Sequence, residues 1–183
     1  MVIVALTGMP AAGKGEVAAV ARERGWAVHR IGDLVWEETK RRGLELAPAS
    51  VGAVANGERE AHGYGVWASR SLERIDALRA AGSHVLIDGM RGEQELVVFR
   101  AAYGDALVTV AVVASAEQRL ARVQQRGRID DGDAAAFHTR DERELGWSLA
   151  ETIAAADETL ANEGELDALR AAAGELLARL ESL

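Results

Sequence analysis

The sequence has no cysteine, and none of its apolar runs is long enough to cross a membrane. Without cysteine, the chain forms no disulfides and offers no thiol nucleophile and no zinc–thiolate site. A membrane-spanning helix needs roughly 18–20 predominantly apolar residues. The first residues also lack the basic region that opens a secretory signal peptide. We therefore expect a cytoplasmic protein that makes no membrane contact.

Positive charge is scarce as well. The 29 acidic residues outnumber the 21 Lys and Arg, and the formal net charge is −8. This balance argues against nucleic-acid binding as the main purpose of the surface. Lys14 and Lys40 are the only lysines, so nearly every cation is an arginine. The chain of 183 residues has no repeat and no change of composition, which predicts a single α/β domain over residues 1–183.

An apolar run at residues 2–6 leads directly into a glycine-rich segment. Such a run, ended by glycine, is typical of a parallel strand that is buried on both faces. The segment matches the phosphate-binding pattern G-x-x-x-x-G-K-[ST] at Gly8, Gly13 and Lys14. In that pattern the backbone N–H groups converge on an anion, and the next helix adds its positive dipole end. The alternative is a glycine-rich turn with a chance lysine.

The segment departs from this pattern at one position, and from a related kinase pattern at two more. Gly15 stands where a Ser or Thr hydroxyl would contact magnesium. The adenylate-kinase form G-x-P-G-x-G-K-G-T is similar, but here Ala11 replaces a glycine and Glu16 replaces the threonine. We expect the methyl group of Ala11 to be tolerated, whereas Glu16 is unfavourable beside phosphates unless it points away. The predicted phosphate-binding loop, called the P-loop below, consists of Gly8, Met9, Pro10, Ala11, Ala12, Gly13, Lys14, Gly15 and Glu16.

Hydrophobic periodicity predicts five strands separated by helices. Residues 44–62 are harder to interpret, because Pro48 and Ser50 suggest a helix start while Gly57 interrupts the pattern. In a kinase, an insertion that binds the acceptor would lie at about residues 44–80. The predicted strands are 2–6, 26–31, 84–89, 106–113 and 158–161, and the clearest predicted helices are 14–24, 33–42, 66–81, 93–102, 116–126, 147–155 and 166–180.

Two acids follow predicted strands. Ligands of open α/β sheets bind at the carboxyl ends of the strands, and Asp88 ends the strand 84–89. We predict that Asp88 holds Mg²⁺ through water; the alternative is an acid that caps a turn or helix before Gly89. Asp33 follows the strand 26–31. It is predicted to orient or deprotonate an attacking hydroxyl, and the alternative is the N-cap of the next helix.

Arginines cluster on a predicted helix–turn–helix between the last two strands, at about residues 119–143. Phosphoryl transfer needs positive charge around the transferring group, so this segment is a candidate lid. The alternative is a solvated face whose arginines pair with the neighbouring acids. Arg126, Arg128 and Arg140 are the leading catalytic candidates, and Arg91 is a candidate contact of the acceptor.

Over nearly its whole length, the chain resembles a mainly archaeal, uncharacterised family of P-loop proteins related to adenylate kinase and dephospho-CoA kinase. The resemblance implies a P-loop NTPase fold of the nucleotide-kinase type, a three-layer α/β/α arrangement with a five-stranded parallel sheet and a helical lid. It also implies ATP and Mg²⁺ as cofactors and an adenine site bordered by Asn162. It implies no particular acceptor. The stretches that carry it are 4–14, 31–33, 87–91, 126–131, 140–147 and 156–164.

Two hypotheses follow. The first is an ATP-dependent phosphotransferase that acts on a nucleotide-like or other small phosphorylated acceptor. The second is a nucleotide-binding regulator or slow ATPase, which Gly15 and Glu16 both favour. The sequence contains no G-x-S-x-G element for a hydrolase triad and no Asn-Lys-x-Asp motif that would read guanine. The oligomeric state is left open.

Overall fold

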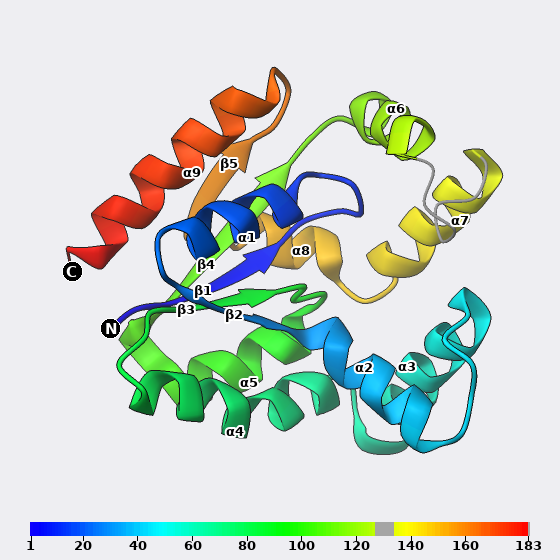
Figure 1. The fold of residues 1–183 in the computed structure, drawn as a ribbon. Coiled ribbons are helices and arrows are strands. Elements are labelled where there is room, and N and C mark those ends of the chain that lie inside the picture. Colours follow the sequence, from blue (N-terminus) through cyan, green and yellow to red (C-terminus); the bar gives the residue numbers. More distant parts are fainter. Residues whose placement is uncertain (127–133, 183) are drawn as a thin grey trace.

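A computed structural model describes residues 1–126 and 134–182. Within these residues the chain forms a five-stranded sheet with the strand order β2-β3-β1-β4-β5, and every neighbouring pair is parallel (Figure 1). The predicted five-stranded parallel sheet is therefore confirmed, with β1 at its centre. The strands are β1 (Ile3–Thr7), β2 (Ala27–Arg30), β3 (Val85–Asp88), β4 (Leu107–Val113) and β5 (Glu158–Ala161).

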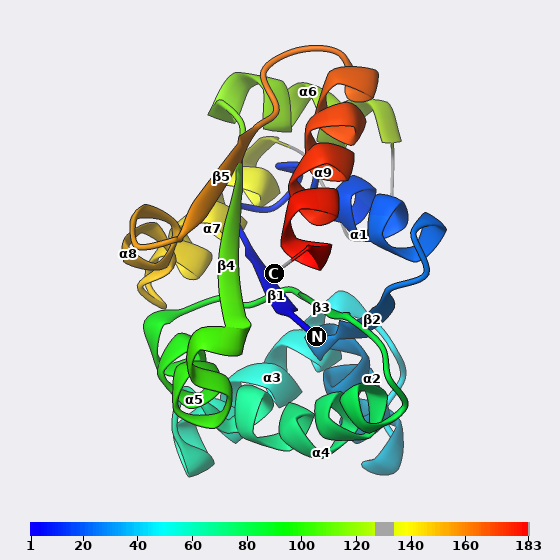
Figure 2. The same ribbon diagram turned by 90° about the vertical axis from the view of Figure 1, so that its left-hand side faces the viewer.

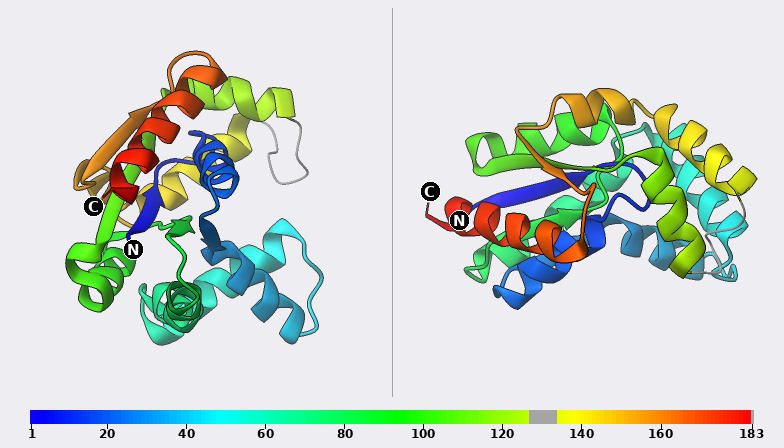
Figure 3. Two further views of the ribbon diagram at one scale, coloured as in Figure 1. Left: turned by 60° about the vertical axis from the view of Figure 1, so that its left-hand side comes forward. Right: turned by 90° about the horizontal axis from the view of Figure 1, so that it is seen from above.

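Helices cover both faces of the sheet, which gives the predicted three layers. On one face α1 (Lys14–Glu23) packs beside α9 (Leu166–Glu181), and on the other lie α4 (Val66–Ala80), α5 (Glu93–Tyr103) and α8 (Leu149–Ala154) (Figures 1 and 2). The short helix η1 (Gly104–Ala106) joins α5 to β4. The remaining helices gather toward the carboxyl ends of the strands (Figures 1 and 3): α2 (Ile31–Arg41), α3 (Pro48–His62), α6 (Ala116–Arg126) and α7 (Ala134–Leu145).

The alternation of β1 explains why this strand is the centre of the molecule. Val4 and Leu6 belong to the core cluster under α1 and α9, whereas Ile3 and Ala5 belong to the cluster under α4 and α5. All four side chains are fully buried, as a strand buried on both faces requires. The P-loop leaves the end of β1, so it starts from the most enclosed strand of the sheet. No helix in the described part of the chain is both long and apolar enough to span a bilayer.

The start of α2 and the extent of α3 differ from the sequence-based expectation. Asp33 does not cap α2, because the helix begins at Ile31 and Arg30 is its N-cap. Ile31 and Leu34 are buried one helical turn apart, so core packing starts the helix earlier than the polar residue suggested. Helix α3 continues through Gly57 to His62. Its start at Pro48 has proline in the first turn, where the missing N–H costs nothing.

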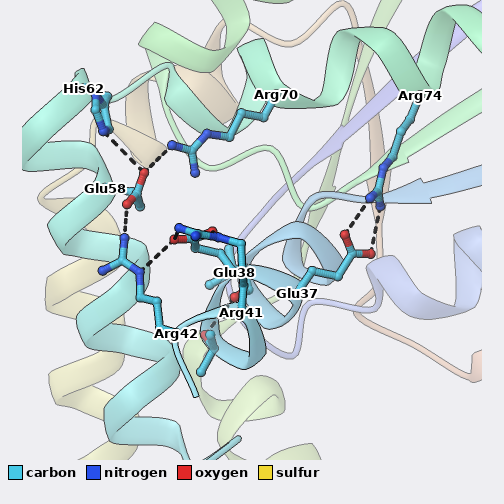
Figure 4. Close-up of polar contacts among 10 residues, drawn as sticks. Glu37, Glu38, Arg41, Arg42, Glu58, His62, Arg70 and Arg74 are labelled. Atoms are coloured by element: carbon cyan, nitrogen blue, oxygen red, sulfur yellow. Dashed lines mark hydrogen bonds and ion pairs between the residues drawn. The ribbon is translucent and has the colours of Figure 1, made fainter. Parts of the chain in front are cut away.

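Ion pairs join α3 to its neighbours α2 and α4 (Figure 4). The Glu58 carboxylate of α3 is buried and receives guanidinium groups from Arg42, the C-cap of α2, and from Arg70 of α4. The Nε2 atom of His62 lies 3.6 Å from the same carboxylate. A single acid thus holds three helices together at the edge of the sheet beside β2. The second bridge in the figure joins Arg74 of α4 to Glu37 of α2 at 2.5 Å.

Replacing Glu58 by Gln is expected to lower the free energy of unfolding by about 1–2 kcal/mol, because the two guanidinium groups would face a neutral amide. Both arginines are partly exposed, so water can take over part of the lost interaction. Urea denaturation followed by circular dichroism measures the change. Glu60→Gln, at an exposed position of the same helix, is the matched control. A Glu58→Gln variant as stable as that control would contradict the account.

Candidate functional site

The P-loop bends back over the end of β1, and α1 begins at Lys14 with Gly13 as its N-cap. Gly8 has φ 134° and Gly13 has φ 114°, both in the region that favours glycine. A Cβ atom at Gly8 would lie 2.3 Å from the Val112 carbonyl oxygen, and one at Gly13 would lie 2.4 Å from Nδ2 of Asn162. Only glycine fits these two positions, so the two glycines of the motif are required by the shape of the loop.

The three departures from the motif have different structural consequences. Ala11 adopts a left-handed conformation with φ 61°, which costs an L-residue about 1–2 kcal/mol; the expectation of a harmless methyl group thus overlooked backbone strain. A Cβ atom at Gly15 would meet nothing within 4 Å, so sterics do not exclude a hydroxyl-bearing side chain there. Glu16 forms an ion pair with Arg170 of α9 at 3.3 Å, and this contact offsets its charge.

Two buried side chains brace the P-loop. Asn162, which follows β5, donates its Nδ2 hydrogen to the Ala12 carbonyl oxygen at 2.8 Å. Arg119 of α6 donates to the Pro10 carbonyl oxygen at 3.1 Å and forms an ion pair with Asp141 of α7 at 2.5 Å. Asn162, which was expected to border the adenine, and Arg119, which lies in the predicted lid, therefore also fix the backbone of the loop. The predicted role of Asn162 at an adenine ring stays a prediction.

The Lys14 side chain folds into the P-loop. Its Nζ atom donates to the carbonyl oxygens of Gly8 and Met9, at 2.5 and 3.0 Å. Burial of the ammonium and the nearby positive charge of Arg91 lower the pKa of Lys14 to about 7, although Glu144 partly opposes this shift. Lys14 therefore changes its charge near neutral pH, and its hydrogen bonds end on carbonyl groups that an anion can replace.

The two predicted acids lie at neighbouring strand ends and share an arginine. Asp88 is paired in register with Leu6 of β1 and with Arg30 of β2. The Nε atom of Arg30 lies 3.7 Å from the Asp88 carboxylate, and its Nη1 atom lies 3.2 Å from that of Asp33. Asp33 is in the first turn of α2 and is 44% exposed. The carboxyl ends of β2 and β3 thus bring both acids to the side of the sheet from which the P-loop leaves.

These residues are suited to hold Mg²⁺ in one particular way. Mg²⁺ keeps several waters and binds through one or two carboxylates together with substrate phosphates. Among the described residues, no group of three or more His, Cys, Asp or Glu is arranged to hold a metal on its own. Asp88 is a single, largely buried carboxylate whose charge acts on Lys14. This donor set fits a hydrated ion that a phosphate group brings with it.

Near Lys14, a buried acid forms ion pairs with arginines from two segments of the chain. Glu144, in the last turn of α7, forms ion pairs with Arg91, which follows β3, and with Arg140, whose Nε atom lies 3.8 Å away. Burial disfavours the charged form of Glu144, but Arg91, Arg140 and Lys14 outweigh it and lower its pKa. Arg140 is thus close to the P-loop. Arg126 ends α6, and Arg128 lies outside the described residues.

Arg91 also lines a cavity of about 260 Å³. The Glu95 carboxylate is buried in its wall, accepts the backbone N–H of Arg91 at 2.7 Å, and lies 3.4 Å from a guanidinium nitrogen of Arg59. Burial raises the pKa of Glu95. The guanidinium carbon of Arg59 lies 4.4 Å from the ring centroid of Trp147. The lining residues are Arg59, Tyr64, Arg91, Gly92, Glu93, Gln94, Glu95, Gly146, Trp147 and Ser148.

Sequence reasoning did not identify three residues of this region. Arg59, Glu95 and Glu144 occur in helices rich in charged residues, where an acid or an arginine usually faces solvent. Their burial depends on how α3, α5 and α7 pack together, and no local pattern shows that. The sequence contained one signal, the glycine directly after Arg91. In the structure the backbone of Gly92 comes so close to a neighbouring turn that a Cβ atom would lie 2.2 Å from the Trp147 carbonyl oxygen.

Comparisons with known proteins agree with this arrangement. A family model described as an AAA domain matches residues 4–145. A UPF0200 protein of Methanosarcina barkeri is 38% identical over 179 residues, which cover 97% of this chain and 95% of the relative. The chain belongs to the UPF0200 family.

The fold of this UPF0200 chain is also that of known P-loop kinases. A shikimate kinase of Acinetobacter baumannii, solved in complex with shikimate, aligns with a TM-score of 0.59 and 17% identity over 100% of this chain and 94% of its own. A gluconokinase of Sinorhizobium meliloti aligns with a TM-score of 0.60 and 17% identity over 98% and 93%. At this identity the likeness establishes the fold alone, and it confirms the P-loop kinase-like architecture.

The lowered pKa of Lys14 predicts that nucleotide binding is coupled to the uptake of a proton. At pH 8 a group with a pKa of about 7 is mostly neutral, and a neighbouring triphosphate favours its charged form. We expect ATP binding at pH 8 to take up close to one proton, and the affinity to fall as the pH rises from 7 to 9. Calorimetric titrations in two buffers of different ionisation enthalpy measure the uptake.

Lys14→Arg is the control for this measurement, because a guanidinium stays protonated at every pH used. Proton uptake should then disappear while a positive charge remains in the loop. Equal uptake in Lys14→Arg and in the unchanged protein would contradict the assignment of the proton to Lys14.

Proposed function

We propose that this protein is an ATP-dependent phosphotransferase that acts on a small nucleotide-like or otherwise phosphorylated acceptor. The observation that supports this most directly is the P-loop itself. Its two obligatory glycines, its lysine and the start of α1 converge beside Asp88 at the end of the central strand. Backbone N–H groups at a helix start, together with a lysine, form a binding site for the phosphates of a nucleotide.

Each residue has a role in this proposal. The main-chain N–H groups of residues 11–15 hold the β- and γ-phosphates, and Lys14 exchanges its carbonyl partners for phosphate oxygens. Asp88 binds Mg²⁺ through water, and the ion supplies charge neutralisation when it is bound. Asp33 orients the attacking group of the acceptor. Arg126, Arg128 and Arg140 balance the charge that develops during transfer, and Asn162 borders the adenine.

The cavity that Arg59 and Trp147 help to line is the proposed acceptor site. Arg91 lines it and is connected through Glu144 to the charges around Lys14, so an acceptor there lies next to the phosphates. Its walls come from three separate segments: the end of α3, the start of α5 and the turn before α8. ATP as the donor agrees with the predicted cytoplasmic location, which stays a prediction.

A nucleotide-binding regulator is the second candidate, and one observation favours it. The cations near the P-loop already have acidic partners, since Arg119 pairs with Asp141 and Arg91 pairs with Glu144. A transferase must release some of these arginines to use them on a phosphoryl group. A sensor would have no such need. Gly15 also favours the regulator, because it offers no hydroxyl to a metal ion.

Turnover separates the two candidates. ATP consumption with Mg²⁺ is measured against a panel of nucleosides, nucleoside monophosphates, sugar acids and coenzyme precursors. The transferase proposal predicts one product that carries a phosphoryl group, formed together with an equal amount of ADP. Lys14→Ala should lower that rate by about a hundredfold or more. Lys40→Ala, which removes the only other lysine at an exposed position, should leave it unchanged.

The opposite results are equally informative. ATP that binds tightly but is neither transferred nor hydrolysed across the panel would support the regulator. ATP consumption that survives Lys14→Ala would contradict both candidates, because the reaction would then not depend on the P-loop.

A further inference from the structure

Glu144 is an acid in an unusual place. Glu144 is 3% exposed, and its carboxylate forms ion pairs with Arg91 and Arg140. Its charge acts to raise the pKa of Lys14, and the charge of Lys14 acts to lower the pKa of Glu144. These cations are the ones that a phosphate-bearing ligand would need. The helix α7 thus supplies one negative charge to the space in which the proposed reaction needs several positive ones.

The side chains of Arg91 and Arg140 are partly buried, at 23% and 28% exposed, and a cluster of such cations is costly without a counter-charge. Removing a partner from a buried ion pair leaves an uncompensated charge and is strongly destabilising. In the ligand-free protein, Glu144 meets this requirement for Arg91. A ligand that brings its own anion to Arg91 meets it equally well, so the arginine can exchange one anion for another without being left unpaired. A neutral ligand offers no such exchange, because it would have to displace Glu144 from Arg91 without replacing its charge.

We propose that Glu144 is a resident counter-anion of Arg91 and that the acceptor replaces it there with an anionic group of its own. The acceptor is therefore a small molecule that carries a phosphate or a carboxylate in addition to the group that receives the phosphoryl. This inference rests on the proposed acceptor site. It adds the residue that binds the anionic group of the acceptor and assigns a competing role to an acid that the proposed mechanism does not otherwise use.

The position of Arg91 supports an exchange at this residue. Its backbone N–H donates to Glu95 at 2.7 Å, its guanidinium contacts Glu144, and the residue is one of those that line the cavity. The main chain of Arg91 is thus held in place, while its side chain is 23% exposed and is paired with Glu144. An anion bound in the cavity therefore competes with Glu144 for this guanidinium.

The test titrates the full-length protein with inorganic phosphate and, separately, with malonate, followed by calorimetry. Glu144→Gln removes the competing charge but keeps the side-chain size. We expect it to tighten the binding of at least one of these anions by about tenfold, within the usual range of coupling between sites. Glu142→Gln, which removes the same charge from an exposed position of the same helix, should change neither affinity. The anion that gains more identifies the phosphate or the carboxylate class.

A double variant assigns the gain to Arg91 rather than to the P-loop. In Glu144→Gln/Arg91→Gln the tightening should disappear, since the exchanged anion has lost its arginine. If Glu144→Gln does not fold, Glu144→Asp gives the same information, because the shorter acid reaches Arg91 less well and should allow a smaller gain. Unchanged or weaker anion binding in these variants, or a gain that persists without Arg91, would overturn the inference.

This result is distinct from a failure of the proposed function. If the protein neither binds ATP nor transfers a phosphoryl group, the coupling between residues 144 and 91 can still be measured with the simple anions. If ATP binds and is turned over while the coupling is absent, the inference alone is wrong.

Discussion

Positive charge enclosed at the carboxyl end of the central strand is the constraint on which the site depends. The P-loop holds Lys14 where burial and Arg91 lower its pKa to about 7, and α7 adds Arg140 to the same region. The protein balances this charge with groups of its own: carbonyl oxygens for Lys14, Glu144 for Arg91 and Asp141 for Arg119. Under the proposed function, the phosphates must displace these partners in order to bind.

The rest of the fold serves to hold that charge in position. Strand β1 is buried on both faces, so the point at which the P-loop starts is rigidly defined by the core. Asn162 and Arg119 then fix the carbonyl groups of Ala12 and Pro10 from β5 and α6. The path of the loop backbone is therefore set by side chains from outside the loop. The strained backbone of Ala11 is tolerated because its surroundings determine the path of the loop.

The sequence predicted those parts of the molecule that local patterns determine. Strand β1 and the P-loop were identified because an apolar run and a spaced glycine–lysine motif are adjacent in the chain. Asp33 was placed wrongly at the start of α2, since a polar residue after a strand resembles a cap, whereas the burial of Ile31 began the helix earlier. Glu95 and Glu144 were missed as buried acids, because only the packing of distant helices removes them from water. Each also has a partner that is remote in sequence, Arg59 for Glu95 and Arg91 for Glu144.

A structure of the protein with Mg²⁺ and a non-hydrolysable ATP analogue tests the central claim most directly. The account predicts that the backbone N–H groups of residues 11–15 surround the β-phosphate. It also predicts that the Lys14 Nζ atom has left the Gly8 and Met9 carbonyl oxygens for phosphate oxygens. An analogue bound elsewhere, with both Lys14 hydrogen bonds still in place, would contradict it.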